Sequence, residues 1–234
     1  GSNVALGADS LKNTTTASNN TAVGKSALGA NTTGTGNTGL GKEAGGAITT
    51  GDFNTFVGIA GFTTTTADNN TAVGYNSMAL NTTGTVNTAV GSTALSANTT
   101  AASNTAIGYG ALATATTGGL NTAVGRSALL DLTTGTPNVA VGAYAGQSVT
   151  TGASNTFIGY QAGDATTTAD GNTAVGRDSL VANTTGASNT AVGRAALDAN
   201  TTASNNTAVG MNSGTAVTTG ASNTYLGAEA GEGN

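Results

Sequence analysis

A five-residue phrase, Asn-Thr-Ala-Val-Gly or a close variant, occurs fourteen times between Asn3 and Gly227. Successive phrases begin seventeen residues apart, except for one step of sixteen between Asn54 and Asn70. A repeat this regular indicates one small structural unit stacked on copies of itself. We predict that the residue missing from the short step lies beside Ile59, directly after a glycine, because turns tolerate deletions.

Positions in the repeat, counted from its Asn, carry different residue types. Position 1 is Asn in every copy (for example Asn20), position 5 is Gly (Gly24), and position 4 is Val, Ile or Leu (Val23). Thr-Thr fills positions 13 and 14 in each of the thirteen copies that extend far enough. Asn at the same place in stacked units predicts an amide ladder. The invariant Gly predicts a corner with positive φ.

The fold class follows from the repeat length and from the absence of an apolar stripe at helical spacing. We predict an all-β protein, a parallel β-solenoid or β-roll of fourteen coils of about seventeen residues. Each coil is expected to contain a strand at positions 2–4, a second around 8–10 and a short extended segment at 12–14. Residues 3–234 form one array, residues 1–2 are interpreted as a cloning scar, and the chain is expected to be a fragment of a longer fibre.

Two positions of the repeat change together. Position 9 is usually Leu or Met, but it is Gly in six copies that form three adjacent pairs. In the second member of each pair, position 3 changes from its usual Ala to an aromatic residue: Phe56, Phe157 and Tyr225. We infer that positions 3 and 9 share one compartment of nearly constant volume. Because positions 3 and 4 point to opposite faces of a strand, the aliphatic residues of position 4 form a separate apolar layer.

One of these two layers is expected to be the interior of the coil, and the other a surface that must be covered. The apolar content is mostly Ala, so the core of a single chain is slim. We therefore predict an obligate homotrimer, coaxial with the solenoid, in which the second layer is buried between chains. The alternative is a self-sufficient monomeric solenoid.

The phrase Asn87-Thr88-Ala89-Val90-Gly91, with the small Ser and Ala residues after it, resembles the repeats of trimeric autotransporter adhesin heads. The stretch NTAVGRDSLVANTTGASNTAVG, residues 172–193, also resembles repeats of phage tail fibres and of bacterial surface fibres. The resemblance spans nearly the whole chain and implies three chains in a left-handed parallel β-roll. The repeat here is longer than in the adhesin heads, and these families offer no shared catalytic motif to map.

Composition narrows the function classes. The chain contains no Cys and no His, which excludes disulfides, thiolate metal sites and His-dependent triads. The neighbours Lys25 and Ser26 are interpreted as a solvated corner rather than a catalytic pair. A net charge of −5 makes nucleic acid an improbable partner, and no apolar run is long enough for membrane insertion. We expect no enzyme activity and no cofactor or metal, and an extracellular location on a bacterial surface or virion appendage.

Position 6, directly after the corner Gly, concentrates basic and aromatic residues. Stacking places them in a stripe that could bind a cell-surface glycan, another anionic polymer or a protein receptor. The competing interpretation is an exposed column of long side chains that keeps the solenoid soluble. The stripe comprises Lys25, Lys42, Tyr75, Tyr109, Arg126, Tyr160, Arg177 and Arg194.

The leading functional hypothesis is a structural and adhesive segment of a trimeric fibre, which presents or contributes to receptor binding. Ice binding by Thr arrays is an alternative, although position 12 varies and would interrupt a second flat row. A tailspike-type polysaccharide depolymerase is a further alternative that needs two carboxylates in one groove. The acids are scattered instead: Asp52, Asp68 and Asp170 share position 16 and are interpreted as polar turns, while Asp164 and Asp198 at position 10 are interpreted as solvated.

Overall fold

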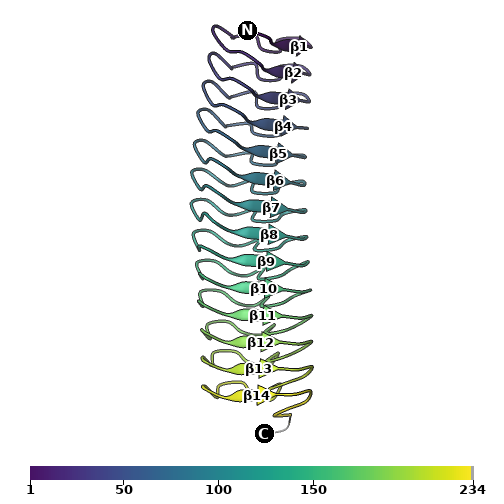
Figure 1. Ribbon diagram of the computed structural model, residues 1–234, viewed down its shortest axis with the longest axis vertical. Helices are drawn as coiled ribbons and strands as arrows, with labels where there is room; N and C mark the ends of the chain where they lie inside the picture. The colour runs from purple at the N-terminus through teal and green to yellow at the C-terminus, as the bar shows by residue number, and fades with distance from the viewer. Residues whose placement is uncertain (233–234) are drawn as a thin grey trace. The chain divides into compact units, whose positions relative to one another are not determined.

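The computed structural model describes residues 1–232. They belong to two compact units, Gly1–Thr117 and Gly118–Asn234, and each unit is described by itself. The end of the predicted array, residues 233–234, lies outside the described residues. Both units are parallel β-solenoids with one strand in each coil, which confirms the predicted class and coil length (Figure 1). Within residues 1–232, no helix is present that could cross a membrane.

The described part of each unit contains seven strands of three residues, formed by positions 2–4 of the repeat. The first unit contains β1 (Val4–Leu6), β2 (Thr21–Val23), β3 (Thr38–Leu40), β4 (Thr55–Val57), β5 (Thr71–Val73), β6 (Thr88–Val90) and β7 (Thr105–Ile107). The second contains β8 (Thr122–Val124), β9 (Val139–Val141), β10 (Thr156–Ile158), β11 (Thr173–Val175), β12 (Thr190–Val192), β13 (Thr207–Val209) and β14 (Thr224–Leu226).

Neighbouring strands within a unit pair in parallel with equivalent repeat positions opposite each other, as in β5 and β6. The register survives the short repeat, because Thr55 of β4 still pairs with Thr71 of β5. Beyond the strand, the amide of Asn76 donates to the carbonyl of Ile59 at 2.8 Å, the bond that positions 7 and 6 make in other coils. Ile59 therefore occupies position 6, and the missing residue is position 7, as predicted.

The two faces of each strand differ in burial. Position 3 points into the coil, and its Ala residues from Ala22 to Ala208 are fully buried. Position 4 points outward and stays half-buried or exposed, with Leu40 48% and Ile158 39% exposed. The interior is therefore the layer that contains position 3, and the aliphatic residues of position 4 form the outer layer.

The shared compartment of positions 3 and 9 is confirmed. Leu28, Leu95 and other leucines of position 9 are fully buried in the interior. Where position 9 is Gly in two consecutive coils, an aromatic ring occupies the space: a Cβ added to Gly146 or Gly163 would overlap the ring of Phe157. The same holds for Gly45 and Gly61 around Phe56 and for Gly231 at Tyr225, while a Cβ at Gly214 would make a tight contact of 3.1 Å with the Tyr225 ring.

The Asn of position 1 forms the predicted ladder inside the coil. The Oδ1 atom of Asn37 accepts hydrogen bonds from the amide of Asn54 at 2.9 Å and from its Nδ2 at 3.1 Å. The Nδ2 atom of Asn37 donates within its own coil to the carbonyl of Gly51 at 2.7 Å. Each buried amide is thus satisfied by the coil before it, the coil after it and its own turn, as buried polar groups require.

The second and third strands expected in each coil are absent from the described residues. Positions 7 and 9 have positive φ, such as 56° at Ser26 and 49° at Leu28, which is incompatible with an extended strand. The segment curls through successive turns but remains bonded between coils, since the amide of Leu28 donates to the carbonyl of Ala44 at 3.0 Å. At position 13, Thr32 donates both its amide and its hydroxyl to the carbonyl of Thr49.

Position 12 belongs to the core, which corrects the expectation that it would interrupt an outer row. Ile48, Leu132 and Val149 at this position are fully buried. Where position 12 is Asn, the side chain folds back on its own turn: Oδ1 of Asn31 accepts from the amide of Gly34 at 2.9 Å. Thr166 and Ala115, also at position 12, are fully buried as well, so the variation at this position changes how the interior is filled.

The shared compartment makes a test by substitution possible. Phe157→Ala should destabilise the protein by about 3–5 kcal/mol through the cavity left behind. The triple variant Phe157→Ala, Gly146→Leu, Gly163→Leu should recover most of this loss, because it rebuilds the Ala and Leu arrangement of other coils. Chemical denaturation would measure both values. A triple variant no more stable than Phe157→Ala would show that the two positions do not share a volume.

Candidate functional site

The stripe at position 6 is positioned by the corner glycine before it. The φ of Gly24 is +127° and that of Gly176 is +135°, a region that favours glycine. A Cβ at Gly24 would also collide with the carbonyl of Gly41 in the next coil, so the corner is closed to any larger residue. The chain reverses here, and the side chain of position 6 is directed away from the core.

All eight residues predicted for the stripe are exposed. In the first unit, the four occur in separate settings: Lys42 pairs with the adjacent Glu43 at 3.4 Å, while Tyr75 and Tyr109 are 59% and 60% exposed. No aromatic or cation–π contact joins these four within the described first unit. The stripe is therefore a column of single exposed side chains in this unit.

In the second unit, the structure brings stripe residues together into a connected group. The guanidinium carbon of Arg126 lies 5.4 Å from the ring centroid of Tyr144, and that of Arg177 lies 5.9 Å from the ring centroid of Tyr160. The two tyrosine rings meet edge to face at 5.9 Å and 90°. We call Arg126, Tyr144, Tyr160 and Arg177 the Arg–Tyr cluster.

Stacking along the stripe brings Tyr160 and Arg177 of neighbouring coils into contact, but Tyr144 was missed. It occupies position 7, where no other coil carries an aromatic residue, and its neighbour Ala143 fills position 6. An aromatic residue beside an empty place in the stripe was the signal available in the sequence. Tyr144 completes the row because its ring reaches the gap left by Ala143.

The Arg–Tyr cluster has an excess of positive charge. Arg177 forms an ion pair with Asp178 at 3.0 Å. In the next coil Arg194 contacts the thioether of Met211 at 3.8 Å. It is exposed and adds a further cation beside the cluster. Guanidinium groups bind carboxylates and sulfates in a planar, bidentate geometry, and tyrosine faces pack against rings. The arrangement is suited to binding an anionic surface polymer.

The acidic residues of position 16, interpreted from the sequence as polar turns, accept hydrogen bonds from backbone amides. Oδ1 of Asp52 accepts from the amide of Thr35 in the preceding coil at 2.6 Å, and Oδ1 of Asp68 accepts from the amide of Asp52 at 2.7 Å. Asp170 makes the equivalent bond to Ala153 at 2.7 Å. Among residues 1–232, no group of three or more His, Cys, Asp or Glu could hold a metal ion.

Asp164 and Asp198 are less solvated than the sequence indicated. Burial raises the pKa of the Asp164 carboxyl above its ordinary value of 3.8, opposed by a hydrogen bond from Gln161 and assisted by the charge of Asp131. Burial also raises the pKa of Asp198. Both lie at position 10, where the side chain rests against the flank of the coil and is only half-buried.

Comparison with known proteins leaves the fold and site as the only guides to function. No protein-family model matches this chain, nor does any curated protein or solved structure. The fold defines a parallel β-solenoid repeat protein with seventeen-residue coils.

The raised pKa of Asp164 gives a pH dependence of stability. Because the folded state holds this proton more tightly than the unfolded state, the free energy of unfolding falls as pH rises through and above 3.8. Asp164→Asn should therefore raise Tm at pH 7 by about 1 °C, the scale of a surface substitution, and leave it unchanged at pH 3. Thermal unfolding followed by circular dichroism would measure the difference. The exposed Glu229→Gln serves as control, and an equal effect of Asp164→Asn at both pH values would contradict the assignment.

Proposed function

We propose that this protein is a structural and adhesive segment of a homotrimeric extracellular fibre, on a bacterial surface or a virion appendage. The observation that supports the proposal is the outer layer of position 4. This position is aliphatic in all fourteen coils, yet its side chains remain half-buried or exposed in a single chain. A residue type held so strictly at an uncovered place supports burial of this layer against a partner surface.

The outer layer is a continuous apolar column within each unit. Equivalent strands stack in register, so Val73, Val90 and Ile107 lie one above another in the first unit, as do Val141, Ile158 and Val175 in the second. Position 2, on the same outward face, is Thr in most coils. Contiguous exposed apolar surface of this kind is typical of interaction sites.

Copies of the same chain are the best match for this column. A second chain carries aliphatic side chains at the same spacing, so each coil meets an equivalent coil and the interface repeats with the fold. The column is narrow, because each strand contributes a single aliphatic residue and one Thr. Narrow columns converge well on a common axis, and the resemblance to trimeric fibres implies three chains in a left-handed roll. Symmetric assembly from one repeated contact is the usual way in which homo-oligomers form.

The adhesive part of the proposal rests on the Arg–Tyr cluster. Position 6 follows the corner glycine and lies outside the strand, and its cluster residues are exposed in a single chain, so we expect assembly through position 4 to leave the cluster accessible. Three chains would present three copies of it, and repeated weak contacts raise avidity without any single strong site. The expected receptor is a cell-surface glycan or protein, with no nucleic acid, membrane insertion or cofactor in the proposed role.

Solution mass tests the assembly. Light scattering should give about 66 kDa, three times the 22.1 kDa of one chain. The double variant Val175→Lys, Val192→Lys should shift the mass to that of one chain, because two stacked charges cannot be buried in an apolar interface.

The matched control is Thr185→Lys, Thr202→Lys, which adds the same charges to exposed places at position 14 in the same coils. It should keep the mass of the unmodified protein. A native mass of 22 kDa would overturn the fibre proposal, and a mass of 44 kDa would replace three chains by two.

Ice binding is a second candidate because the outward face of the strands is also an ordered array. Thr88 and Val90 on β6, and their equivalents on neighbouring strands, place hydroxyl and methyl groups in rows about 4.8 Å apart. Thermal hysteresis would measure this activity, and we expect none. Both functions need the same face, so a monomer with clear hysteresis, lost in Val175→Lys, Val192→Lys, would establish ice binding in place of fibre assembly.

A further inference from the structure

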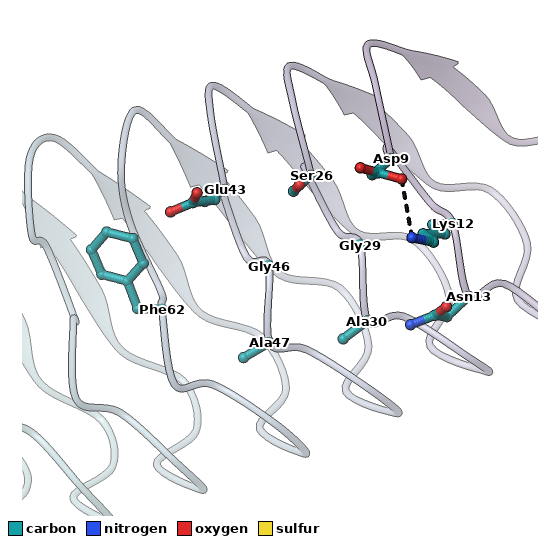
Figure 2. A pocket seen from close by; sticks show the side chains of 10 residues that line it. All are labelled: Asp9, Lys12, Asn13, Ser26, Gly29, Ala30, Glu43, Gly46, Ala47 and Phe62. Carbon is teal, nitrogen blue, oxygen red and sulfur yellow. Dashed lines mark ion pairs between the residues drawn. The ribbon is translucent and has the colours of Figure 1, made fainter.

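An open groove lies on the flank of the first unit, between the corner and the segment of positions 10 and 11. It crosses four consecutive coils, those of β1 to β4, and has a volume of about 430 Å³. Figure 2 shows the ring of Phe62 at one end and the Asp9–Lys12 pair at the other, with Glu43 along its length. The floor between them is formed by Gly29, Gly46 and two alanines.

The groove exists because two coils depart from the repeat. Position 10 is Gly only at Gly29 and Gly46, and the other twelve coils carry a side chain there. Neither glycine has a positive φ, and a Cβ at either would lie 3.2 Å from the nearest heavy atom, close but without overlap. The fold therefore does not require glycine at these two places, and their effect is to hollow the flank.

Two further departures coincide with the same groove. Phe62, its end wall, is the one aromatic residue at position 10 in the chain. The coil that carries Phe62 is also the short one, which lacks position 7, the place from which Asp9, Ser26 and Glu43 reach the groove in the preceding coils. Three independent irregularities of a strict repeat thus meet at one surface. Irregularities of this kind are expected where a repeat scaffold carries a specific site.

Three charged side chains line the groove: Asp9, Lys12 and Glu43. Asp9 pairs with Lys12 at 3.2 Å, and Glu43 pairs with Lys42 at 3.4 Å. These exposed ion pairs hold their partners weakly, so their donors and acceptors remain available to a ligand. Asn13 and Ser26 add an amide and a hydroxyl. The groove therefore offers donors, acceptors and one aromatic ring, and its lining of two carboxylates and one ammonium group does not attract an anionic polymer.

We infer that this groove binds a neutral oligosaccharide. A sugar ring has an apolar face that packs on an aromatic ring such as Phe62, and its hydroxyls both donate and accept at the polar edge. The four coils span about 14 Å at the spacing of stacked strands, which matches a short linear sugar chain lying along the solenoid. The inference rests on the proposed adhesive function for its biological use, but the site differs from the Arg–Tyr cluster and from the interface of position 4.

Saturation-transfer NMR with maltotriose, cellotriose, mannotriose and chitotriose as probes tests the inference on the full chain. At least one probe should bind. Gly46→Leu should raise the Kd for that probe at least tenfold, because the leucine side chain fills the floor of the groove. Leucine is compatible with position 10, since Leu130 occupies it in another coil. Phe62→Ala should cause a similar loss of affinity by removing the aromatic wall.

The control variant is Ala113→Leu, which adds the same side chain at position 10 of the β7 coil, outside the groove. Its Kd should stay within twofold of the unmodified protein. Absence of binding to all four probes, or equal affinity of Gly46→Leu and Ala113→Leu, would overturn the inference. Stronger binding of polygalacturonate, blocked by Gly46→Leu, would overturn the neutral assignment.

The outcome is independent of the assembly test. A protein of 66 kDa that binds none of the probes would overturn the oligosaccharide inference and support the fibre proposal. A protein of 22 kDa that binds a probe through the groove at Gly46 and Phe62 would support the inference and overturn the fibre proposal.

Discussion

Hydrogen bonding between equivalent residues of successive coils is the constraint on which the structure depends. Within each unit the strands pair in parallel with repeat position opposite repeat position, and the turns that follow are bonded between coils as well. Inside the coil, the Asn ladder also connects each coil to the next along the stack. Because every coil must match the coils above and below it, the residue that fits at a position depends mainly on the equivalent positions of adjacent coils. Its neighbours in sequence matter less.

This constraint explains why so much was accessible from the sequence. The fourteen copies meet one packing problem, so a change at position 3 reveals its contact at position 9, as Phe157 and its two glycines show. The ladder at position 1 and the corner at position 5 could be predicted because an invariant Asn and an invariant Gly each fit one structural role in a stacked repeat. The deletion beside Ile59 could be placed because the strands on either side had to stay in register.

Other features could not be predicted because they oppose local preference. Leucine rarely adopts a positive φ, yet Leu28 and its equivalents do so with φ near 50°. Burial of the leucine side chain in the shared compartment is gained only in that conformation, so tertiary packing overrides the backbone preference. The same curl removes the expected second strand. The groove and the contacts of Tyr144 were missed because each involves side chains from several coils. The directions of these side chains depend on this curl.

The short coil of Phe62 has a consequence for how such an array can vary. Loss of position 7 leaves β4 and β5 paired without a shift, so a change of length at this corner is absorbed locally. Insertions there should be tolerated on the same grounds, since the turn is outside the strand and its ends remain fixed by the coils above and below. Position 7 is thus a place where a solenoid of this kind can vary the length and sequence of its surface loops while the paired strands stay unchanged.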